Sequence, residues 1–283
     1  MSAQLVHTIA GVREAVVRFR GARKTIGLVP TMGALHAGHG RLIETARAEC
    51  GAVAVSVFVN PIQFDRADDY ERYPRTLATD TAFAEARGAD LVFAPEIAEM
   101  YPRRQRAYVD VEVLAQHLCG QFRPGHFRGV ATVVAKLLDI VQPDRAYFGE
   151  KDAQQLAVIR RMVADLNLPV EIVGVPTVRE ADGLALSSRN QHLSADERAL
   201  APLLYRSLQA AEAAIVSGER NPEQARQAAL TVLSSEPRIR VEYFEIVDPE
   251  ELQPVAEIAA PVLVAAAAFL SATRLIDNLV ARP

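Results

Sequence analysis

The sequence predicts an α/β fold built on a parallel sheet, followed by a smaller α+β part. Short apolar segments alternate with segments of helical periodicity that are about 10–15 residues long. The segment 52–60 is apolar at odd and even positions alike, as expected for a strand covered on both faces. After residue 177 the alternation stops. We therefore expect one domain at residues 1–177 and a second at 178–283.

The elements of the first domain follow from its hydrophobic pattern. In the segment 39–50, Leu42, Ile43 and Ala46 share one helical face, and the helix expected over 129–142 ends before Pro143. The expected strands are 24–29, 52–60, 89–95, 145–149 and 170–176, and the expected helices are 39–50, 78–88, 129–142 and 153–167. Right-handed crossovers would make these strands parallel, with ligands binding beside their carboxyl ends.

The second domain opens with a capping box formed by Ser194 and Glu197, which predicts a helix that closes near Gly218. Asn221 as N-cap and Pro222 at the first helical position predict the next helix. Two strands are expected at 240–248 and 261–270. Helices followed by a small sheet indicate an α+β domain.

Composition and charge favour a cytosolic protein that binds small molecules. The 283 residues carry a net charge of -4, so neither nucleic acid nor an anionic membrane is expected as the main partner. The longest apolar run, 260–272, is too short to cross a bilayer, and no signal peptide is recognisable. Cys50 and Cys119 form no CxxC pair, and we expect both to be buried free thiols.

The segment VPTMGALHAGH, residues 29–39, places two histidines at a predicted turn from strand to helix. If Gly38 and His39 open the helix, its first N–H groups attract anions, phosphate in particular. His36 and His39 would aim further donors at the same place, and Gly33 would serve the turn. A metal-binding pair or two structural histidines are the alternatives. Neither a P-loop nor a GxGxxG motif is present.

Two further strand ends carry polar residues suited to a small ligand. Asn60 and Gln63 follow the strand 52–60 and offer neutral donors and acceptors, although an Asn-Pro turn alone would also explain Asn60. After the strand 145–149, Lys151 can neutralise phosphate, and Asp152 can accept from hydroxyl groups or cap the helix. Gln155 shares the face of Asp152, and Gly149 permits close approach of a ligand.

The segment 182–190 lies at the expected domain junction. Ser187 and Ser188 beside Arg189 suit a phosphate clamp that could close over the site, with a polar linker as the alternative. A second basic segment holds Arg123, His126 and Arg128, whose role the sequence leaves open. The acidic segment 65–76 is expected to be solvated, and Asp80 is considered as a magnesium ligand. No GxSxG motif supports serine-hydrolase chemistry.

At this point the motifs resemble one family closely. PTMGALHAGH, VFVNPIQF, FGEKDAQQL, LALSSRN and TRLIDN are similar, in order and spacing, to the pantoate–β-alanine ligases, also called pantothenate synthetases. These belong to the HxGH nucleotidyltransferase superfamily. The resemblance implies a Rossmann-like first domain that binds ATP and pantoate, a C-terminal lid and a homodimer. It also implies that ATP and (R)-pantoate form pantoyl adenylate, that β-alanine then displaces AMP, and that Mg²⁺ accompanies ATP.

The resemblance also implies site residues. His39 matches the family's proton donor, and His36, Lys151 and Arg189 are the other candidates for the chemistry. Gln63 and Gln155 would hold pantoate, with Asn60 and Arg123 as additions to the substrate-binding set. The residues expected to bind ATP are Met32, Gly33, Ala34, Leu35, His36, Ala37, Gly38, His39, Gly149, Glu150, Lys151, Asp152, Val178, Leu186, Ser187, Ser188 and Arg189.

The sequence departs from the family pattern at Gly40, which is expected to loosen the first helical turn, and at Ala153. Two rival functions remain. Another nucleotidyltransferase would share the two histidines but lack the paired glutamines, and a catalytically inactive nucleotide sensor would bind ATP without turnover.

Overall fold

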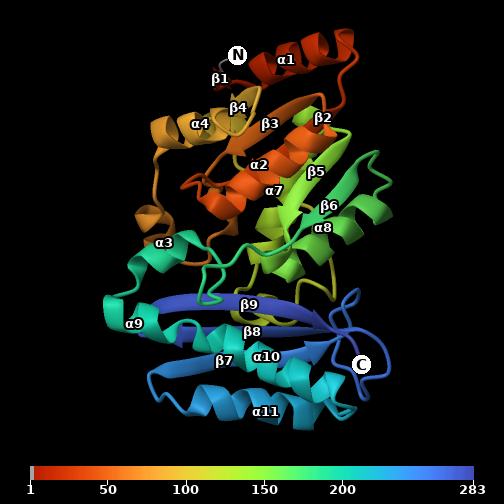
Figure 1. The fold of residues 1–283 in the computed structure, drawn as a ribbon. Helices are drawn as coiled ribbons and strands as arrows, with labels where there is room; N and C mark the ends of the chain where they lie inside the picture. Colours follow the sequence, from red (N-terminus) through yellow and green to blue (C-terminus); the bar gives the residue numbers. More distant parts are fainter. Residues whose placement is uncertain (1–2) are drawn as a thin grey trace.

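The computed structural model describes residues 3–283, apart from the side chains of residues 67 and 68, and contains two β-sheets (Figure 1). Six parallel strands in the order β1-β4-β3-β2-β5-β6 form the larger sheet, and three antiparallel strands in the order β7-β8-β9 form the smaller one. The strands are β1 (Gln4–Val6), β2 (Ile26–Thr31), β3 (Ala52–Val57), β4 (Leu91–Phe93), β5 (Arg145–Gly149), β6 (Glu171–Val175), β7 (Ile239–Val247), β8 (Val262–Leu270) and β9 (Thr273–Ala281). The α/β prediction, with a smaller α+β part, is confirmed.

Helices cover both sheets. The α-helices are α1 (Ile9–Gly21), α2 (Ala37–Glu49), α3 (Ala67–Arg72), α4 (Leu77–Glu85), α5 (Ile97–Met100), α6 (Cys119–Phe122), α7 (His126–Val141), α8 (Ala153–Asp165), α9 (Ala195–Leu200), α10 (Leu203–Val216) and α11 (Pro222–Ser234). Three short 3₁₀ helices are η1 (Pro61–Gln63), η2 (Glu150–Asp152) and η3 (Ser188–His192).

The topology of the larger sheet creates a crevice in its middle. From β2 the chain proceeds through β3 to β4 on one side, and it then returns to place β5 and β6 on the other. Because the direction of winding changes between β2 and β5, the segments that follow these strands diverge and leave room for a ligand.

The strands of the larger sheet are buried on both faces. Ile26 and Leu28 of β2 belong to an apolar cluster with α1, α7 and α8, whereas Val29 belongs to a cluster with α2. This alternation follows from the two-residue period of a strand. It accounts for the uninterrupted apolar runs on which the prediction of parallel strands rested.

The smaller sheet joins the two halves of the molecule. Leu263 and Ala265 of β8 pack into the cluster of the larger sheet, and Val264 and Ala266 pack with α10 and α11. In the lower half of Figure 1, α10 and α11 lie with the three-stranded sheet. One face of this sheet therefore contacts the parallel-sheet half, and the other is covered by its own helices.

Several predicted boundaries were wrong. The strand predicted over 52–60 ends at Val57, because the chain turns into η1 at Asn60. Pro202 divides the helix predicted from Ser194 to Gly218 into α9 and α10, although the capping box at Ser194 and the N-cap at Asn221 are confirmed. Elements β1, α1 and β9 were not predicted. The strand β1 is only three residues long, and it is defined by its pairing with β4.

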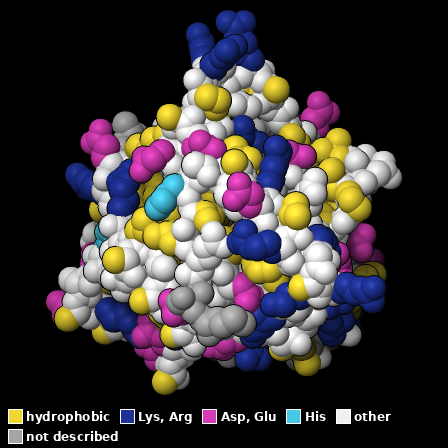
Figure 2. Space-filling model, turned by 90° about the horizontal axis from the view of Figure 1, so that it is seen from above, with side chains coloured by type: hydrophobic (Ala, Val, Ile, Leu, Met, Phe, Trp, Pro, Cys, Tyr) yellow, Lys and Arg dark blue, Asp and Glu magenta, His cyan; other side chains and the backbone are white. Residues whose placement is uncertain are grey.

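Cys50 and Cys119 are buried free thiols, as predicted. On the face in Figure 2, which views the molecule from the α1 end, basic and acidic side chains are interspersed among apolar ones. Within residues 3–283, no helix combines the length and apolar character needed to cross a membrane.

Candidate active site

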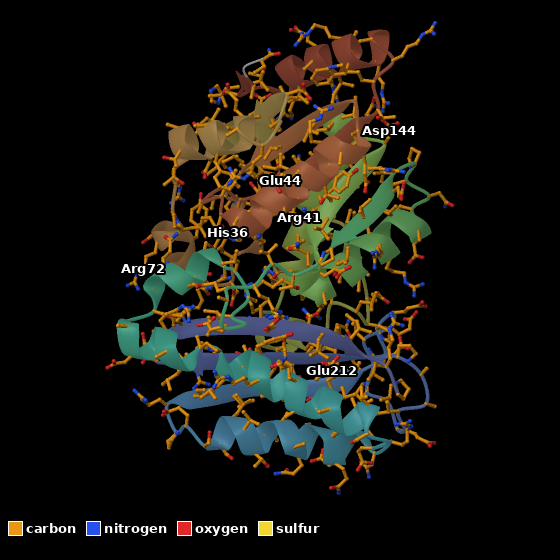
Figure 3. All side chains as sticks on the ribbon, viewed as in Figure 1. His36, Arg41, Glu44, Arg72, Asp144 and Glu212 are labelled. Atoms are coloured by element: carbon orange, nitrogen blue, oxygen red, sulfur yellow. The ribbon has the colours of Figure 1, made fainter. Side chains whose placement is uncertain are left out.

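A cleft that is open to solvent lies beside the carboxyl ends of β2 and β5. Figure 3 labels His36 at the end of α2 that points toward the three-stranded sheet. Asp144, which precedes β5, lies at the opposite end of the larger sheet. The cleft thus occupies the position expected for a ligand site in a sheet of this topology.

The two histidines cap α2, and this fixes their tautomers. The His36 Nδ1 accepts from the Gly38 N–H at 3.1 Å, and the His39 Nδ1 accepts from the His36 N–H at 3.3 Å. Each Nδ1 is therefore unprotonated, and in a neutral ring the proton resides on Nε2. The ring centroids lie 4.1 Å apart, and both rings line the cleft. The pair can therefore offer two neutral N–H donors to a ligand.

Burial keeps these rings neutral. Burial and the positive charge of Lys151 lower the pKa of His36 from 6.5 to about 4. Burial, the charge that His36 can carry and Lys151 lower the pKa of His39 to about 3. Without a bound anion, both imidazoles are therefore uncharged at neutral pH and donate hydrogen bonds without carrying positive charge.

The loop between β2 and α2 is held by a buried carboxylate. Asp80, which is 2% exposed, accepts from the Ala34 N–H at 3.1 Å and the Leu35 N–H at 2.8 Å. Gly33 turns the chain with a φ of +90°, and its N–H donates to Thr31 Oγ1. Asp80 thus organises the loop. Its oxygens accept from the loop and from Thr76, and Asp80 does not line the cleft, so the structure gives no support to its use as a magnesium ligand.

Asn60 lines the cleft and orients Gln63 there. The Asn60 Nδ2 donates to Gln63 Oε1 at 2.9 Å and to the Gly129 carbonyl at 3.2 Å, while its Oδ1 accepts from the Tyr101 hydroxyl at 2.7 Å. Its polar atoms are therefore occupied by protein partners. Among the contacts of the described residues, the Gln63 Nε2 has only the Met32 sulfur as a partner, at 3.0 Å, which is a weak acceptor. Gln63 is the residue of this pair with a donor left for a ligand.

The segment after β5 presents Lys151, Asp152 and Gln155 to the cleft. Asp152 occupies the N-cap position of α8, but its side chain makes no capping hydrogen bond. Its carboxylate is therefore not engaged in capping, which had been the alternative explanation for an aspartate at this place. Ala153 begins α8 and packs against the core, so this departure from the family pattern is accommodated.

The acidic segment is not wholly solvated, and that prediction was wrong. Asp69 lies 3.5 Å from the Arg189 guanidinium, and Asp65 forms an ion pair with Arg123 at 3.0 Å. Tyr73 lines the cleft, and burial raises the pKa of its hydroxyl. The segment therefore contacts both arginines of the predicted site.

His126 supports the chain at Gln63. The His126 Nδ1 donates to the Gln63 carbonyl at 2.7 Å, and burial and the charge of Arg123 lower the pKa of the ring to about 4. Arg128 instead lies over the Tyr108 ring, 4.0 Å from its centroid, and does not line the cleft. Of the basic segment, Arg123 and His126 therefore belong to the site.

Most of the residues predicted from the sequence are brought together. Those that line the cleft are Met32, His36, Gly38, His39, Asn60, Gln63, Arg123, Gly149, Lys151, Asp152, Gln155, Val178, Leu186, Ser187, Ser188 and Arg189. Those placed beside it but not in its lining are Gly33, Ala34, Leu35, Ala37 and Glu150.

Sequence reasoning missed the apolar wall and several polar neighbours. Val130, Val133, Val134 and Leu137 of α7 line the cleft, and their helical spacing had been used only to predict the helix over 129–142. Tyr73 and Thr177 also line it. Among residues 3–283, no group of three His, Cys, Asp or Glu side chains is placed to hold a metal ion.

The arrangement suits a ligand with a polyanionic part and a small polar part. Two neutral imidazoles, the start of α2 and the cations Lys151 and Arg189 surround one region of the cleft. Gln63 and Gln155 offer amide groups in the same cleft, next to the apolar wall of α7. Such a site can compensate charge on phosphates while an adjacent group is held by neutral hydrogen bonds.

Comparison with known proteins agrees with this chemistry. The model of the family described as pantoate-beta-alanine ligase matches residues 4–280. A bifunctional pantoate ligase/cytidylate kinase from Thermosynechococcus vestitus is 54% identical over 274 residues, covering 96% of this chain. The matched part is 53% of that protein, so the chain spans about half the length of this relative.

Two solved structures share the fold over nearly the whole chain. The pantothenate synthetase of Thermus thermophilus is 50% identical with a TM-score of 0.94, and the match covers 99% of both chains. The pantoate-beta-alanine ligase of Francisella tularensis, solved in complex with beta-gamma ATP and beta-alanine, is 32% identical with a TM-score of 0.79. That match covers 98% of this chain and 97% of the other.

Proposed function

The chain belongs to the pantoate–β-alanine ligase family, and on that premise we propose that its cleft condenses (R)-pantoate with β-alanine. The reaction consumes ATP, passes through pantoyl adenylate, and yields pantothenate, AMP and pyrophosphate. The observation that carries this assignment is the convergence of His36, His39 and Lys151 on one cleft beside the start of α2. This arrangement can stabilise the charge that develops on the phosphates during the transfer of an adenylyl group.

In the first step, a carboxylate oxygen of pantoate attacks the α-phosphorus of ATP. The bond from that phosphorus to the bridging oxygen breaks, and pyrophosphate leaves with the electron pair. Both reactants are anions, so positioning and charge compensation supply most of the catalysis. Lys151 and Arg189 compensate the charge, and the Nε2–H groups of His36 and His39 donate to the phosphates.

The same premise assigns the substrates to parts of the cleft. Gln63 and Gln155 hold the hydroxyl groups and the carboxylate of pantoate, and the valines of α7 contact its methyl groups. Asn60 and Arg123 act through neighbours, since Asn60 bonds Gln63 and Arg123 pairs with Asp65. Magnesium would bind mainly through the phosphate oxygens of ATP and water, its preferred ligands, and would offset phosphate charge there.

In the second step, the neutral amine of β-alanine attacks the acyl carbon of the adenylate. The bond from that carbon to the phosphate oxygen breaks, AMP leaves with the electron pair, and the nitrogen loses a proton. Because the adenylate is a reactive mixed anhydride, exclusion of water favours the amide product. We assign that role to residues 178–283 acting as a lid, with Leu186 to Arg189 closing over the ATP.

We further propose that the protein is a cytoplasmic homodimer. The resemblance to the family supports the dimer, and the net charge of -4 supports a soluble setting. The division at residues 177 and 178 separates the larger sheet from the smaller one and stays a prediction.

Pyrophosphate release measured with ATP and pantoate, with and without β-alanine, tests the function. We expect a burst close to one equivalent of enzyme without β-alanine, and continuous release with pantothenate formation when β-alanine is added. Turnover with a phosphorylated alcohol in place of pantoate would indicate another nucleotidyltransferase. Thermal stabilisation by ATP without any turnover would indicate a nucleotide sensor.

A further inference from the structure

The C-terminal strand β9 reaches the segment that carries Lys151. The side-chain amide of Asn278 donates to the carbonyl of Glu150 at 3.0 Å and to the carbonyl of Lys151 at 2.7 Å. Both hydrogens of one amide are therefore used on two successive carbonyl groups. Asn278 is only 9% exposed, so these bonds form away from competing water.

Asn278 is itself held in place by a buried ion pair. Arg179 donates to both carboxylate oxygens of Asp277, at 2.6 and 3.0 Å. Asp277 accepts from the Asn278 N–H at 2.8 Å, and Arg179 donates to the Asn278 carbonyl at 3.3 Å. The main chain of Asn278 is thus fixed on both its N–H and its C=O sides, which leaves its side chain little freedom.

The segment that receives these bonds lacks side-chain caps of its own. Neither η2 nor the start of α8 is capped by a side-chain hydrogen bond. Gly149, the residue before η2, is not tightly packed either, because a Cβ added there would meet no atom within 4 Å. Among the described contacts, Asn278 is therefore the side chain that fixes the carbonyl groups of Glu150 and Lys151.

We propose that Asn278 is a positioning residue for the ATP site: through the carbonyls of Glu150 and Lys151, it sets where the Lys151 ammonium meets the triphosphate. This role of Asn278 depends on the proposed function in one respect, which is that the cleft binds ATP. The smaller sheet then also contributes to the phosphate site, because the two hydrogen bonds connect β9 to η2, the segment that follows β5.

The chemistry of the contact distinguishes positioning from mere packing. An aspartate has the shape of asparagine, but an ionised carboxylate has no hydrogen to donate and would face two carbonyl oxygens. On protonation it regains one donor. Burial near Asp277 favours that neutral form, whereas two positive charges favour the ionised one. These are the guanidinium of Arg179, which contacts the Asn278 carbonyl, and the ammonium of Lys151, whose main-chain carbonyl Asn278 contacts. The effect of Asn278→Asp should therefore depend on pH, whereas that of Asn278→Ala should not.

The test measures the dissociation constant of MgATP by calorimetry for Asn278→Ala and Asn278→Asp, relative to wild type, between pH 8 and pH 6. At pH 8, we expect Asn278→Ala to bind about tenfold more weakly, from the loss of two hydrogen bonds, and Asn278→Asp to bind more weakly still. As the pH falls, the defect of Asn278→Asp should shrink below that of Asn278→Ala.

The matched control is Asn221→Asp, the same change at the N-cap of α11. There the side-chain oxygen accepts from the N–H groups of Glu223 and Gln224, and an aspartate oxygen can accept from them equally well. This control should leave MgATP binding unchanged. Wild-type affinity in Asn278→Ala would overturn the proposal, and so would a defect of Asn278→Asp that is the same at every pH. This test measures only the binding of MgATP and not turnover. Failure of the ligase assignment would be seen in the separate pyrophosphate assay, as ATP binding without pyrophosphate release.

Discussion

At the scale of single residues, the side chains of the cleft are oriented mainly by hydrogen bonds to main-chain atoms. His36 and His39 accept from N–H groups at the start of α2, and His126 donates to the Gln63 carbonyl. The first two rings are thereby left with an Nε2–H for the ligand. The histidines of the site are consequently neutral donors whose orientation is set before any substrate binds.

This arrangement predicts a loss of stability in mild acid. Burial lowers the pKa of His126 to about 4 in the folded protein, while the unfolded chain retains the ordinary value of 6.5. Between pH 6.5 and 4 the unfolded chain therefore binds more protons, so the free energy of unfolding falls as the pH is lowered. His36 and His39 act in the same direction.

The contribution of His126 can be isolated in the variant His126→Gln, whose amide can still donate to the Gln63 carbonyl. We expect its free energy of unfolding to depend less steeply on pH than that of wild type, by up to about 1.4 kcal/mol per pH unit. Urea denaturation at pH 7, 6 and 5 measures this slope. Parallel slopes for the two proteins would show that His126 does not titrate differently in the folded state.

At the scale of elements, α7 and η1 are packed against each other with no space for a side chain between them. A Cβ added at Gly129 would lie 2.3 Å from the Ile62 carbonyl oxygen and 2.6 Å from the Gln63 Cα. The carbonyl of Gly129 also accepts from Asn60, which orients Gln63. The position of α7 thus determines where the glutamine of the substrate pocket lies.

We therefore expect Gly129→Ala to lower the free energy of unfolding by about 1–3 kcal/mol. It should also raise the KM for pantoate more than the KM for ATP, because η1 carries Gln63 and not the phosphate ligands. Gly21→Ala is the control, since a Cβ there meets no atom within 4 Å. Equal changes in the KM for pantoate and the KM for ATP would show that the packing of α7 against η1 does not specifically position the pantoate pocket.

Most elements could be predicted because hydrophobic period and capping residues act locally. The strand 145–149 and the caps at Ser194 and Asn221 depend on neighbours in sequence, and the structure has them as expected. The three-residue β1 depends on pairing with β4, a partner distant along the chain. Its short segment carries no pattern that distinguishes it from a loop.

The same distinction applies to the site. Residues next to strand ends were found because topology places them at the carboxyl edge of the sheet. The roles of Asp80, Tyr73 and Asn278 depend on contacts between segments far apart in sequence, which one sequence does not reveal. That Gly40 loosens the first turn of α2 stays a prediction. The structure adds that its missing Cβ makes room for Arg87, whose guanidinium lies over the Phe83 ring.

At the scale of the whole molecule, two sheets contribute to one cleft. The segments that follow the strands of the larger sheet supply the histidines and Lys151, and the chain between β6 and β7 supplies Ser187, Ser188 and Arg189. The smaller sheet adds Asn278, which holds the main chain at Lys151. We infer that changes in the packing of either sheet alter the phosphate site, even when they lie outside the cleft.

The central claim is that both imidazoles, the start of α2 and Lys151 act together on the triphosphate. The most direct measurement is the rate of pyrophosphate formation from ATP and pantoate by His39→Ala, compared with wild type under single-turnover conditions. We expect a loss of roughly 10²-fold or more, by analogy with the removal of one oxyanion donor, with folding intact by circular dichroism. A rate close to that of wild type would contradict it.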